Sequence, residues 1–214
     1  MNGELEAARR QVAEAGRRMV ADGLVLGTAG NVSVRVGELV AISPSSIPYH
    51  LVNADDVCVV DLTGEPLADL ETPPPSSETP MHLAIYADTH AAAVVHHHGL
   101  SSAAVSTVVD ELPPLHYYAL QLGGPTRVAE YATFGTDELA RSVHDALEDR
   151  TAALMQNHGA VAYGDTLDRA YDRARLLEWL CALHIQAHQL GRPRVLTAAE
   201  LADVTRHKAE RAAR

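Results

Sequence analysis

The stretch Ala91-Ala92-Ala93-Val94-Val95-His96-His97-His98 decides the fold around it. Its short apolar run predicts a buried strand that ends in three consecutive histidines. Side chains on a strand alternate between its two faces, so His96 and His98 point the same way and His97 points the other way. Histidine costs free energy to bury without a partner. We therefore expect His96 and His98 to bind a metal ion, and His97 to be a structural histidine.

A second apolar run, Ala152-Ala153-Leu154-Met155, is followed closely by His158 and Gly159. It predicts another buried strand with an imidazole just beyond its end. A tetrahedral zinc ion with three protein ligands keeps its fourth position open for chemistry. His96, His98 and His158 are accordingly the predicted metal ligands.

Outward from these two strands, the chain alternates between the periods of strands and helices. Alternating and short apolar runs predict further strands at residues 32–36, 39–43, 57–62, 112–120 and 127–132, and the segment 160–163 follows His158. Helical spacing predicts helices at residues 4–22, 76–88, 101–109, 136–148, with Thr136 as N-cap, and 166–190. The proline-rich residues 69–75 are expected to be a loop within one domain that spans residues 1–214. This mixture predicts an α/β or α+β fold in which helices flank a mixed sheet in three layers.

Pro75-Ser76-Ser77-Glu78 opens one of the predicted helices, and two interpretations fit it. In the first, Ser77 caps the helix and Glu78 complements the helix dipole in the first turn. In the second, the exposed N–H groups and serine hydroxyls form an anion site, and a carboxylate beside a bound cation transfers protons. The residue types alone leave both interpretations open.

Two other polar loops have the composition of anion-binding loops. Gly27-Thr28-Ala29-Gly30-Asn31-Val32-Ser33 combines glycines with hydroxyl and amide donors, which suits a loop around a phosphate group. Ser43-Pro44-Ser45-Ser46 is a second small polar turn. Plain turns explain both stretches equally well, so each is a weak signal alone.

The composition restricts the possible partners. The 214 residues carry a formal net charge of −11, which argues against a nucleic acid or an anionic membrane, since either needs a basic face. A phosphorylated substrate remains compatible, because backbone N–H groups bind phosphate without net positive charge. Cys58 and Cys181 show no disulfide or metal-ligand spacing, and no segment has the roughly 18 apolar residues of a membrane span. We expect a cytoplasmic protein with two free thiols.

Taken in this order, the motifs resemble those of the class II aldolase family, and most of all its enzymes for L-fuculose 1-phosphate. The similarity covers residues 27–35, 43–49, 75–82, 93–98, 116–117, 131–136 and 154–159. Its most specific parts are Gly-Thr-Ala-Gly-Asn-Val-Ser-Val-Arg from Gly27 and Tyr-Ala-Thr-Phe-Gly-Thr from Tyr131. The ordered set is far more specific than any single motif.

This resemblance implies a fold, an assembly and a reaction. The fold would be a single class II aldolase/adducin-like domain, an αβα three-layer sandwich around a mixed, largely antiparallel sheet, assembled as a C4 homotetramer. The reaction would be the reversible cleavage of a ketose 1-phosphate into dihydroxyacetone phosphate and an aldehyde, L-lactaldehyde in the case of L-fuculose 1-phosphate. The cofactor would be one Zn²⁺ per subunit, or another divalent metal.

The resemblance also assigns roles to particular residues. His96, His98 and His158 would bind the zinc, and Glu78 would transfer the proton and occupy the open metal position when no substrate is bound. Tyr117 would be a second catalytic residue, and Phe134 would lie on the aldehyde side. The phosphate pocket would be lined by Thr28, Gly30, Asn31, Ser45, Ser46, Ser76 and Ser77.

The chain departs from the family pattern at two places. Ser46 stands where the family has glycine, and serine does not readily adopt a positive φ. We therefore expect a changed backbone approach to the phosphate, or a hydroxyl contact in its place. The family's C-terminal tyrosine is absent, because no tyrosine follows Tyr171 and Arg211 stands near that place.

Three alternatives remain open at this stage. A pentulose-phosphate 4-epimerase or a methylthioribulose-1-phosphate dehydratase would use the same kind of zinc site, although the stretch from Tyr131 favours an aldolase. A non-catalytic metal- or sugar-binding protein is the alternative of another class. The presence of Glu78 together with all three histidines argues against it.

Overall fold

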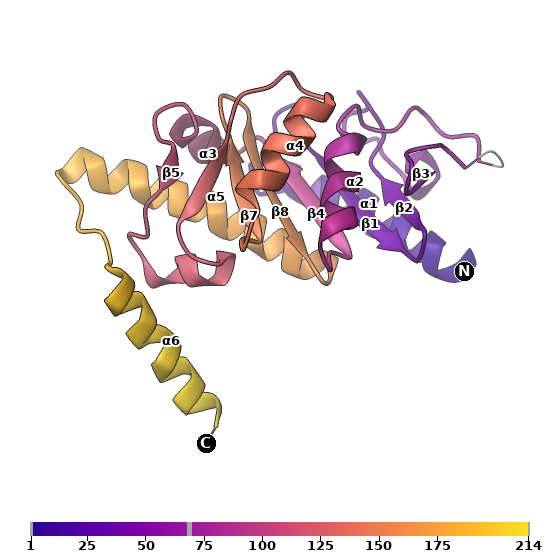
Figure 1. Cartoon of the computed structure of the whole chain (residues 1–214). Coiled ribbons are helices and arrows are strands. Elements are labelled where there is room, and N and C mark those ends of the chain that lie inside the picture. The colour runs from indigo at the N-terminus through magenta and orange to yellow at the C-terminus, as the bar shows by residue number, and fades with distance from the viewer. Residues whose placement is uncertain (1, 68–69, 214) are drawn as a thin grey trace.

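The computed structural model describes residues 2–67 and 70–213, so Asp69 of the expected loop lies outside the described residues (Figure 1). The helices are α1 (Asn2–Ala21), α2 (Thr79–Asp88), α3 (Leu100–Val105), α4 (Asp137–Ala146), α5 (Leu167–Leu190) and α6 (Ala198–Ala212), with 3-10 turns η1 (Ala54–Asp56) and η2 (Tyr117–Leu122). The strands are β1 (Asn31–Val36), β2 (Leu39–Ile42), β3 (Cys58–Asp61), β4 (Ala93–His97), β5 (Glu111–Leu112), β6 (Thr126–Ala129), β7 (Ala152–Met155) and β8 (Gly159–Gly164).

The strands form one mixed sheet in the order β3-β2-β1-β4-β8-β7-β6-β5. The pair β6–β7 is parallel and the other pairs are antiparallel. The histidine-bearing strand β4 lies between β1 and β8, where His96 is opposite Asn31 on one side and Val161 on the other. The centre of the sheet therefore brings residues 31, 96 and 158 close together from three distant parts of the sequence.

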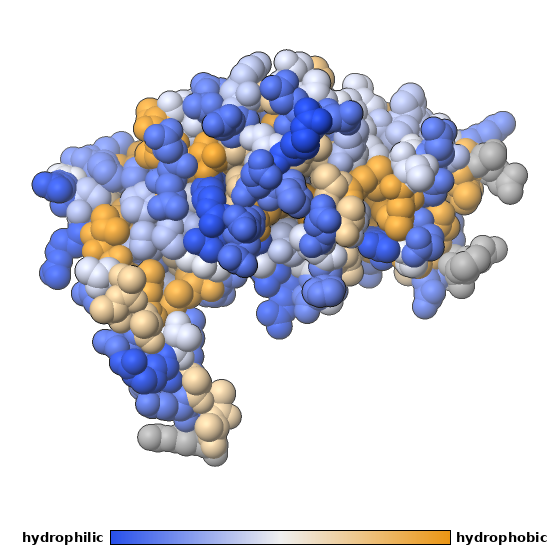
Figure 2. All heavy atoms as spheres, in the orientation of Figure 1, coloured by the Kyte–Doolittle hydropathy of each residue, from blue (hydrophilic) through white to orange (hydrophobic). Residues whose placement is uncertain are grey.

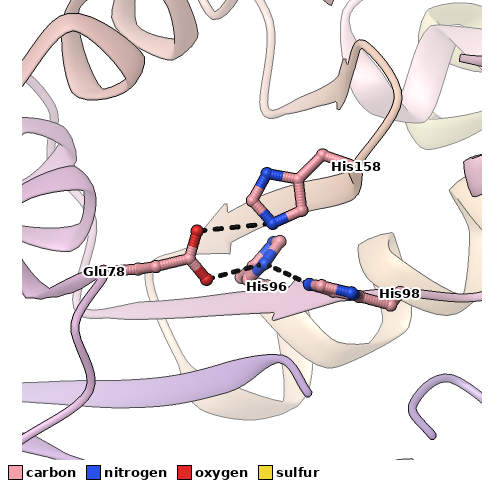
Figure 3. Close-up of side chains that lie close together, drawn as sticks. All are labelled: Glu78, His96, His98 and His158. Atoms are coloured by element: carbon pink, nitrogen blue, oxygen red, sulfur yellow. Dashed lines mark hydrogen bonds and ion pairs between the residues drawn. The ribbon is translucent and has the colours of Figure 1, made fainter. Parts of the chain in front are cut away.

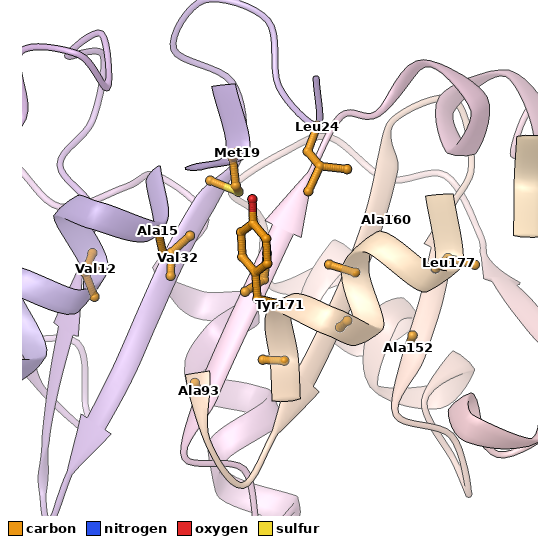
Figure 4. Packing of buried hydrophobic residues seen from close by; sticks show 14 of the residues in the cluster. Val12, Ala15, Met19, Leu24, Val32, Ala93, Ala152, Ala160, Tyr171 and Leu177 are labelled. Carbon is orange, nitrogen blue, oxygen red and sulfur yellow. The ribbon is translucent and has the colours of Figure 1, made fainter. Parts of the chain in front are cut away.

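Helices cover both faces of the sheet, which confirms the predicted αβα sandwich. On one face α1 and α5 pack on the sheet through residues such as Met19, Tyr171 and Leu177, with Tyr171 at the centre of Figure 4. On the other face α2 and α4 pack on it through a second cluster that includes Ile85 and Val143. Because strand side chains alternate, Val95 belongs to the first cluster and Val94 to the second. His96 therefore faces the α2 layer and His97 faces the α5 layer.

The prediction of a strand at residues 112–120 is wrong. The strand β5 ends at Leu112, and Pro113 and Pro114 follow it, which cannot donate to a sheet ladder. His116 then accepts a hydrogen bond from the backbone N–H of Tyr118 through its Nδ1 and starts the 3-10 turn η2. The apolar and aromatic residues of this stretch belong to a turn that packs against α5, and not to a strand.

The structure shows which residues cap the starts of helices α4 and α2. The hydroxyl of Thr136 accepts a hydrogen bond from the N–H of Leu139, which confirms Thr136 as the N-cap of α4. The N-cap of α2 is Glu78, so the interpretation in which Ser77 caps this helix is wrong. Ser76 explains the difference, because its carbonyl and hydroxyl accept the N–H groups of Thr79 and Glu78 and form a separate turn before the helix.

Helix α6 extends away from the rest of the molecule in Figure 1 and was not predicted from the sequence. A capping box marks its start, since Thr197 accepts from the N–H of Glu200 and the carboxylate of Glu200 accepts from the N–H of Thr197. Leu201 is the buried residue that α6 contributes to the described structure. Among the described residues, the structure has no helix that is long and apolar enough to span a bilayer.

Candidate metal centre and active site

Three imidazoles meet at one end of the central strands. His96 is the last but one residue of β4, His98 follows the end of that strand, and His158 lies in the turn between β7 and β8. Their ring centroids are 4.8–4.9 Å apart, and the Nε2 atoms of His96 and His98 are separated by 2.9 Å. The alternation of side chains along β4 thus produces the pairing of His96 with His98 that the sequence predicts.

Glu78 completes the cluster from the start of α2, and its carboxylate points between the rings of His96 and His158 in Figure 3. Its Oε2 lies 3.0 Å from Nε2 of His96, and its Oε1 lies 3.4 Å from Nε2 of His158. Glu78 is 6% exposed and His96 is fully buried, so this is an ion pair almost without solvent.

This arrangement fits a metal ion. One ligand atom from each of Glu78, His96, His98 and His158 lies within 4.8 Å of the others. Two nitrogens bound tetrahedrally to one zinc at about 2.1 Å are roughly 3.4 Å apart, so small rotations of the side chains suffice to bind it. The Nδ1 of His96 faces the carbonyl of Ala160 at 2.9 Å. That contact makes Nδ1 a proton donor to the carbonyl, so Nε2, which faces the centre of the cluster, is the nitrogen that would bind a metal after losing its proton.

The surroundings of the cluster shift the pKa values of Glu78, His98 and His158 so that these residues can bind a metal at neutral pH. Burial would raise the pKa of Glu78, but the charge of His96, the hydrogen bond to it and the charge of His158 together hold that pKa well below its ordinary value. Burial followed by the charge of His96 lowers the pKa of His98 to about 3 and that of His158 to about 4. At neutral pH, His98 and His158 therefore offer unprotonated nitrogens and Glu78 is a carboxylate.

A cavity of about 330 Å³ opens beside this cluster. Glu78, His98 and His158 line its floor, whereas fully buried His96 lies behind it. All seven residues predicted for the phosphate pocket line this cavity, and so does Phe134: Thr28, Gly30, Asn31, Ser45, Ser46, Ser76, Ser77 and Phe134. The structure therefore brings three separate polar loops together next to the histidines.

Tyr117 lies elsewhere. Its ring is 39% exposed, stacks on His116 and lines a surface groove with residues of α6. Within one chain, Tyr117 does not reach the cavity beside Glu78.

The glycine-rich loop rests directly on the end of β4. Gly30 has a φ of +72°, and a Cβ atom there would lie 2.7 Å from the carbonyl oxygen of His96. The hydroxyl of Tyr49 donates a 2.7 Å hydrogen bond to the carbonyl of Gly30 and fixes the loop from the other side. Only glycine allows this close approach of the loop to the metal-binding strand.

Ser46, which stands where the family has glycine, adopts a backbone conformation that favours glycine. Its φ is +62°, in the left-handed region, which is unusual for serine. Ser46 therefore adds a hydroxyl to the cavity wall while its backbone lies in the left-handed region, and its contact with the phosphate stays a prediction. The surrounding polar turn imposes the conformation in spite of its cost of about 1–2 kcal/mol.

The sequence interpretation missed other residues of this site. Asn157, Tyr131 and Ala132 also line the cavity, and Asn157 has a φ of +55°. Asparagine tolerates the left-handed region, so Asn157-His158-Gly159 between two apolar runs signals a hairpin turn. That signal places the side chain of residue 157 next to the third histidine.

A buried histidine of α2 makes the stability of the fold depend on pH. Burial, followed by the charge of His96, lowers the pKa of His82 to about 3, whereas an unfolded histidine titrates near 6.5. Between these values the unfolded chain binds a proton that the folded chain excludes, so stability is lost as the pH falls below about 6.5. We expect unfolding in urea to show a loss between pH 7 and pH 5 that is about 2 kcal/mol smaller for His82→Gln than for the unsubstituted chain. Equal losses would mean that His82 is not kept neutral by the fold.

The sequence and the structure of this chain are similar to those of known proteins from one family. Residues 10–185 match the model of the class II aldolase and adducin N-terminal domain. The chain is 33% identical to 5-deoxy-D-ribulose 1-phosphate aldolase of Bacillus thuringiensis serovar kurstaki, over 94% of this chain and 95% of that protein. It is 37% identical to L-fuculose phosphate aldolase of Escherichia coli K12, over 91% of each chain. A solved structure of L-fuculose 1-phosphate aldolase superposes with a TM-score of 0.89 at 32% identity, covering 95% of this chain and 96% of that one.

The chain belongs to the class II aldolase family. With its cluster of three histidines and one carboxylate, it is a metal-dependent aldehyde-lyase.

Proposed function

We propose that this protein is a zinc-dependent aldolase that reversibly cleaves a ketose 1-phosphate into dihydroxyacetone phosphate and an aldehyde. The observation that carries the proposal is the continuity of one cavity between the Glu78–histidine cluster and the three polar loops. A carbonyl carbon and a phosphate three bonds away in the same substrate need such neighbouring sites. The named activities of relatives with similar length support a ketose 1-phosphate.

The residues of the cluster suit zinc. His96, His98 and His158 would hold the ion with Glu78 as a fourth ligand that a substrate displaces. Bound there, the metal would act as a Lewis acid for the negative charge that develops on the substrate oxygens when the carbon chain breaks.

The polar loops would bind the phosphate through neutral donors. Thr28, Ser45, Ser46, Ser76 and Ser77 offer hydroxyl groups around the cavity, and the start of α2 offers backbone N–H groups. This arrangement accommodates a dianion on a chain whose net charge is −11. Phosphate binding would also orient the reacting carbons relative to Glu78.

Glu78 is the residue that we propose for proton transfer. Its Oε2 accepts a hydrogen bond from Asn31, whereas its buried Oε1 has no hydrogen-bond donor in the described structure apart from the ion pair with His158. In cleavage the hydroxyl proton on O4 passes to solvent, the bond between C3 and C4 breaks as O4 becomes the aldehyde oxygen, and C3 receives a proton that Glu78 has taken up from solvent. In condensation the carboxylate removes that proton again.

The aldehyde side of the cavity is apolar. Tyr131 and Phe134 are 62% and 65% exposed at its rim. We propose that they contact the aldehyde, and that the catalytic role of Tyr117 is exercised in a neighbouring subunit of a C4 homotetramer. One apolar patch on the face in Figure 2 lies where α6 leaves the body of the molecule, next to the groove of Tyr117. Light scattering should give a mass four times that of the chain.

The reaction is tested with a panel of ketose 1-phosphates that includes L-fuculose 1-phosphate and 5-deoxyribulose 1-phosphate. Zinc-loaded protein should release dihydroxyacetone phosphate, measured by coupled reduction. A product that keeps its complete carbon chain, as a C4 epimer or a dehydrated sugar, would replace the proposal with an epimerase or a dehydratase. Binding without any turnover on the whole panel would support the non-catalytic alternative.

The hydroxyl of Ser46 should contribute to phosphate binding. Ser46→Gly keeps the left-handed backbone and removes only the hydroxyl, so KM for the ketose 1-phosphate should rise about tenfold, as for loss of one hydrogen bond to a charged group. The thermal midpoint should change little, because glycine relieves strain but also makes the unfolded chain more flexible. Steady-state kinetics and calorimetry measure the two effects. An unchanged KM would show that Ser46 does not contact the phosphate.

A further inference from the structure

A ladder of buried polar side chains joins α2 to β1 behind the cavity. Glu78 at the N-cap of α2 is followed at intervals of four residues by His82 and Tyr86 in the helix, and Asn31 and Ser33 stand two residues apart on β1. Four residues of helix rise about 6 Å and two residues of strand about 6.6 Å, so the two rows stay in step. All five residues are buried, and Ser33 and His82 are fully enclosed.

The ladder is a continuous chain of hydrogen bonds. Nδ2 of Asn31 lies 2.9 Å from Oε2 of Glu78, and Oδ1 of Asn31 lies 2.5 Å from Nε2 of His82. The hydroxyl oxygen of Ser33 lies 2.7 Å from Nδ1 of His82 and 2.7 Å from the hydroxyl oxygen of Tyr86. No member of this chain reaches the cavity except Asn31 and Glu78.

Only one assignment of protons satisfies the chain while Glu78 is ionised and the ring of His82 is neutral. A carboxylate only accepts, so the amide N–H of Asn31 donates to Glu78 and its carbonyl oxygen faces His82. His82 must then carry its proton on Nε2 and accept on Nδ1. The hydroxyl of Ser33 donates to that Nδ1 and accepts from the hydroxyl of Tyr86. Every donor in the chain therefore points toward Glu78.

We infer that His82 is a positioning residue for proton transfer by Glu78: in its neutral Nε2–H form it holds the amide of Asn31 so that the N–H group faces the carboxylate. The direction of the hydrogen bonds is independent of the proposed function, whereas their effect on proton transfer rests on it. The low pKa of His82, about 3, agrees with a neutral ring.

The consequence for Glu78 follows from the geometry. With Asn31 donating, Oε2 is fixed and stabilised as an anion, and Oε1 is left to exchange the proton with C3. Without the N–H of His82, the amide of Asn31 is free to turn its carbonyl oxygen toward Glu78, where two acceptors would repel each other. The carboxylate would then move from its position, and a displacement of about 1 Å costs about a hundredfold in rate.

The catalytic test uses a partial reaction that reports on Glu78 alone. Zinc-loaded protein is incubated with dihydroxyacetone phosphate in D₂O without an aldehyde, and exchange of the C3 hydrogen is followed by NMR. We expect His82→Asn, whose shorter amide cannot reach Asn31, to lower the maximal exchange rate about a hundredfold, with KM changed less than about threefold. His82→Gln replaces the Nε2–H donor and should recover at least a tenth of the original rate.

A matched variant separates positioning from general damage to α2. Ile85→Ala leaves a cavity in the same helix but lies outside the ladder and the active-site cavity. Below its unfolding temperature, Ile85→Ala should exchange within about twofold of the unsubstituted protein. If His82→Asn exchanges as fast as Ile85→Ala, or His82→Gln is no better than His82→Asn, the inference is overturned.

A second measurement does not depend on the reaction. In protein labelled with ¹⁵N-histidine, the ¹⁵N shifts of His82, identified by their loss in His82→Gln, should show a protonated Nε2 and an unprotonated Nδ1. The opposite tautomer, or a charged ring at pH 7, would overturn the inference even if the exchange rates behaved as expected. If the unsubstituted protein shows no exchange at all, the proposed function fails, and the tautomer still decides the direction of the ladder.

Discussion

Glu78→Gln is expected to lower the rate of cleavage and of condensation by about 10²- to 10⁴-fold, the usual contribution of a general acid–base residue. Glutamine has nearly the same shape and still accepts the hydrogen bond from Asn31, but it cannot take up or release a proton. The three histidines remain, so zinc content should stay near one ion per subunit. The fall should appear in kcat, since the phosphate loops that determine most of the binding are unchanged.

Two measurements make this prediction specific. Glu148→Gln removes the same charge from an exposed position far from the cavity and should leave kcat unchanged. Zinc content by elemental analysis shows whether the loss in Glu78→Gln is a loss of chemistry or a loss of metal. If Glu78→Gln keeps its zinc and its full turnover, Glu78 is a structural N-cap and another group transfers the proton.

The histidine cluster was predictable because one rule of strand geometry suffices for it. Side chains at His96 and His98 must share a face, and an apolar run followed by His158 indicates a second strand end. This rule cannot predict which strand pairs with β4, and therefore which residues lie beside its histidines. The antiparallel pairing of β1 with β4 places Asn31 beside His96, and no local sequence pattern indicates which strands will pair.

The polar ladder shows the same limit more sharply. Glu78, His82 and Tyr86 stand four residues apart, and Asn31 and Ser33 two apart, so both rows are visible in the sequence. Each row alone resembles an ordinary amphipathic pattern. Only the contact of α2 with β1 makes them one hydrogen-bonded chain, and this contact is a property of the tertiary structure.

Other places where the structure departs from simple sequence preference have local causes. Ser46 adopts a positive φ because the fold of the turn outweighs the preference of a single residue. Residues 112–120 are largely apolar and aromatic but contain two adjacent prolines that exclude a strand. Helix α6 begins with a recognisable capping box, yet it buries so little that an apolar stripe does not reveal it.

His98→Ala is expected to remove the metal and with it essentially all activity, by more than about 10³-fold. His98 offers an unprotonated nitrogen, because burial and the charges of His96 and His158 lower its pKa to about 3. Its loss leaves two imidazoles and one carboxylate, and a zinc site with fewer than its three histidines holds the ion much less tightly. Dialysis of the unsubstituted protein against a chelator should give the same loss, reversed by added zinc.

The metal should also stabilise the fold, which gives this prediction a readout that needs no substrate. A ligand at a hundred times its dissociation constant stabilises the native state by about 2.7 kcal/mol. Added zinc should therefore raise the thermal midpoint of the chelated protein and leave that of His98→Ala unchanged. His90→Ala, which removes an exposed histidine far from the cluster, should respond to zinc like the unsubstituted protein. An equal zinc response of His98→Ala and His90→Ala would place the metal somewhere other than between β4 and the β7–β8 turn.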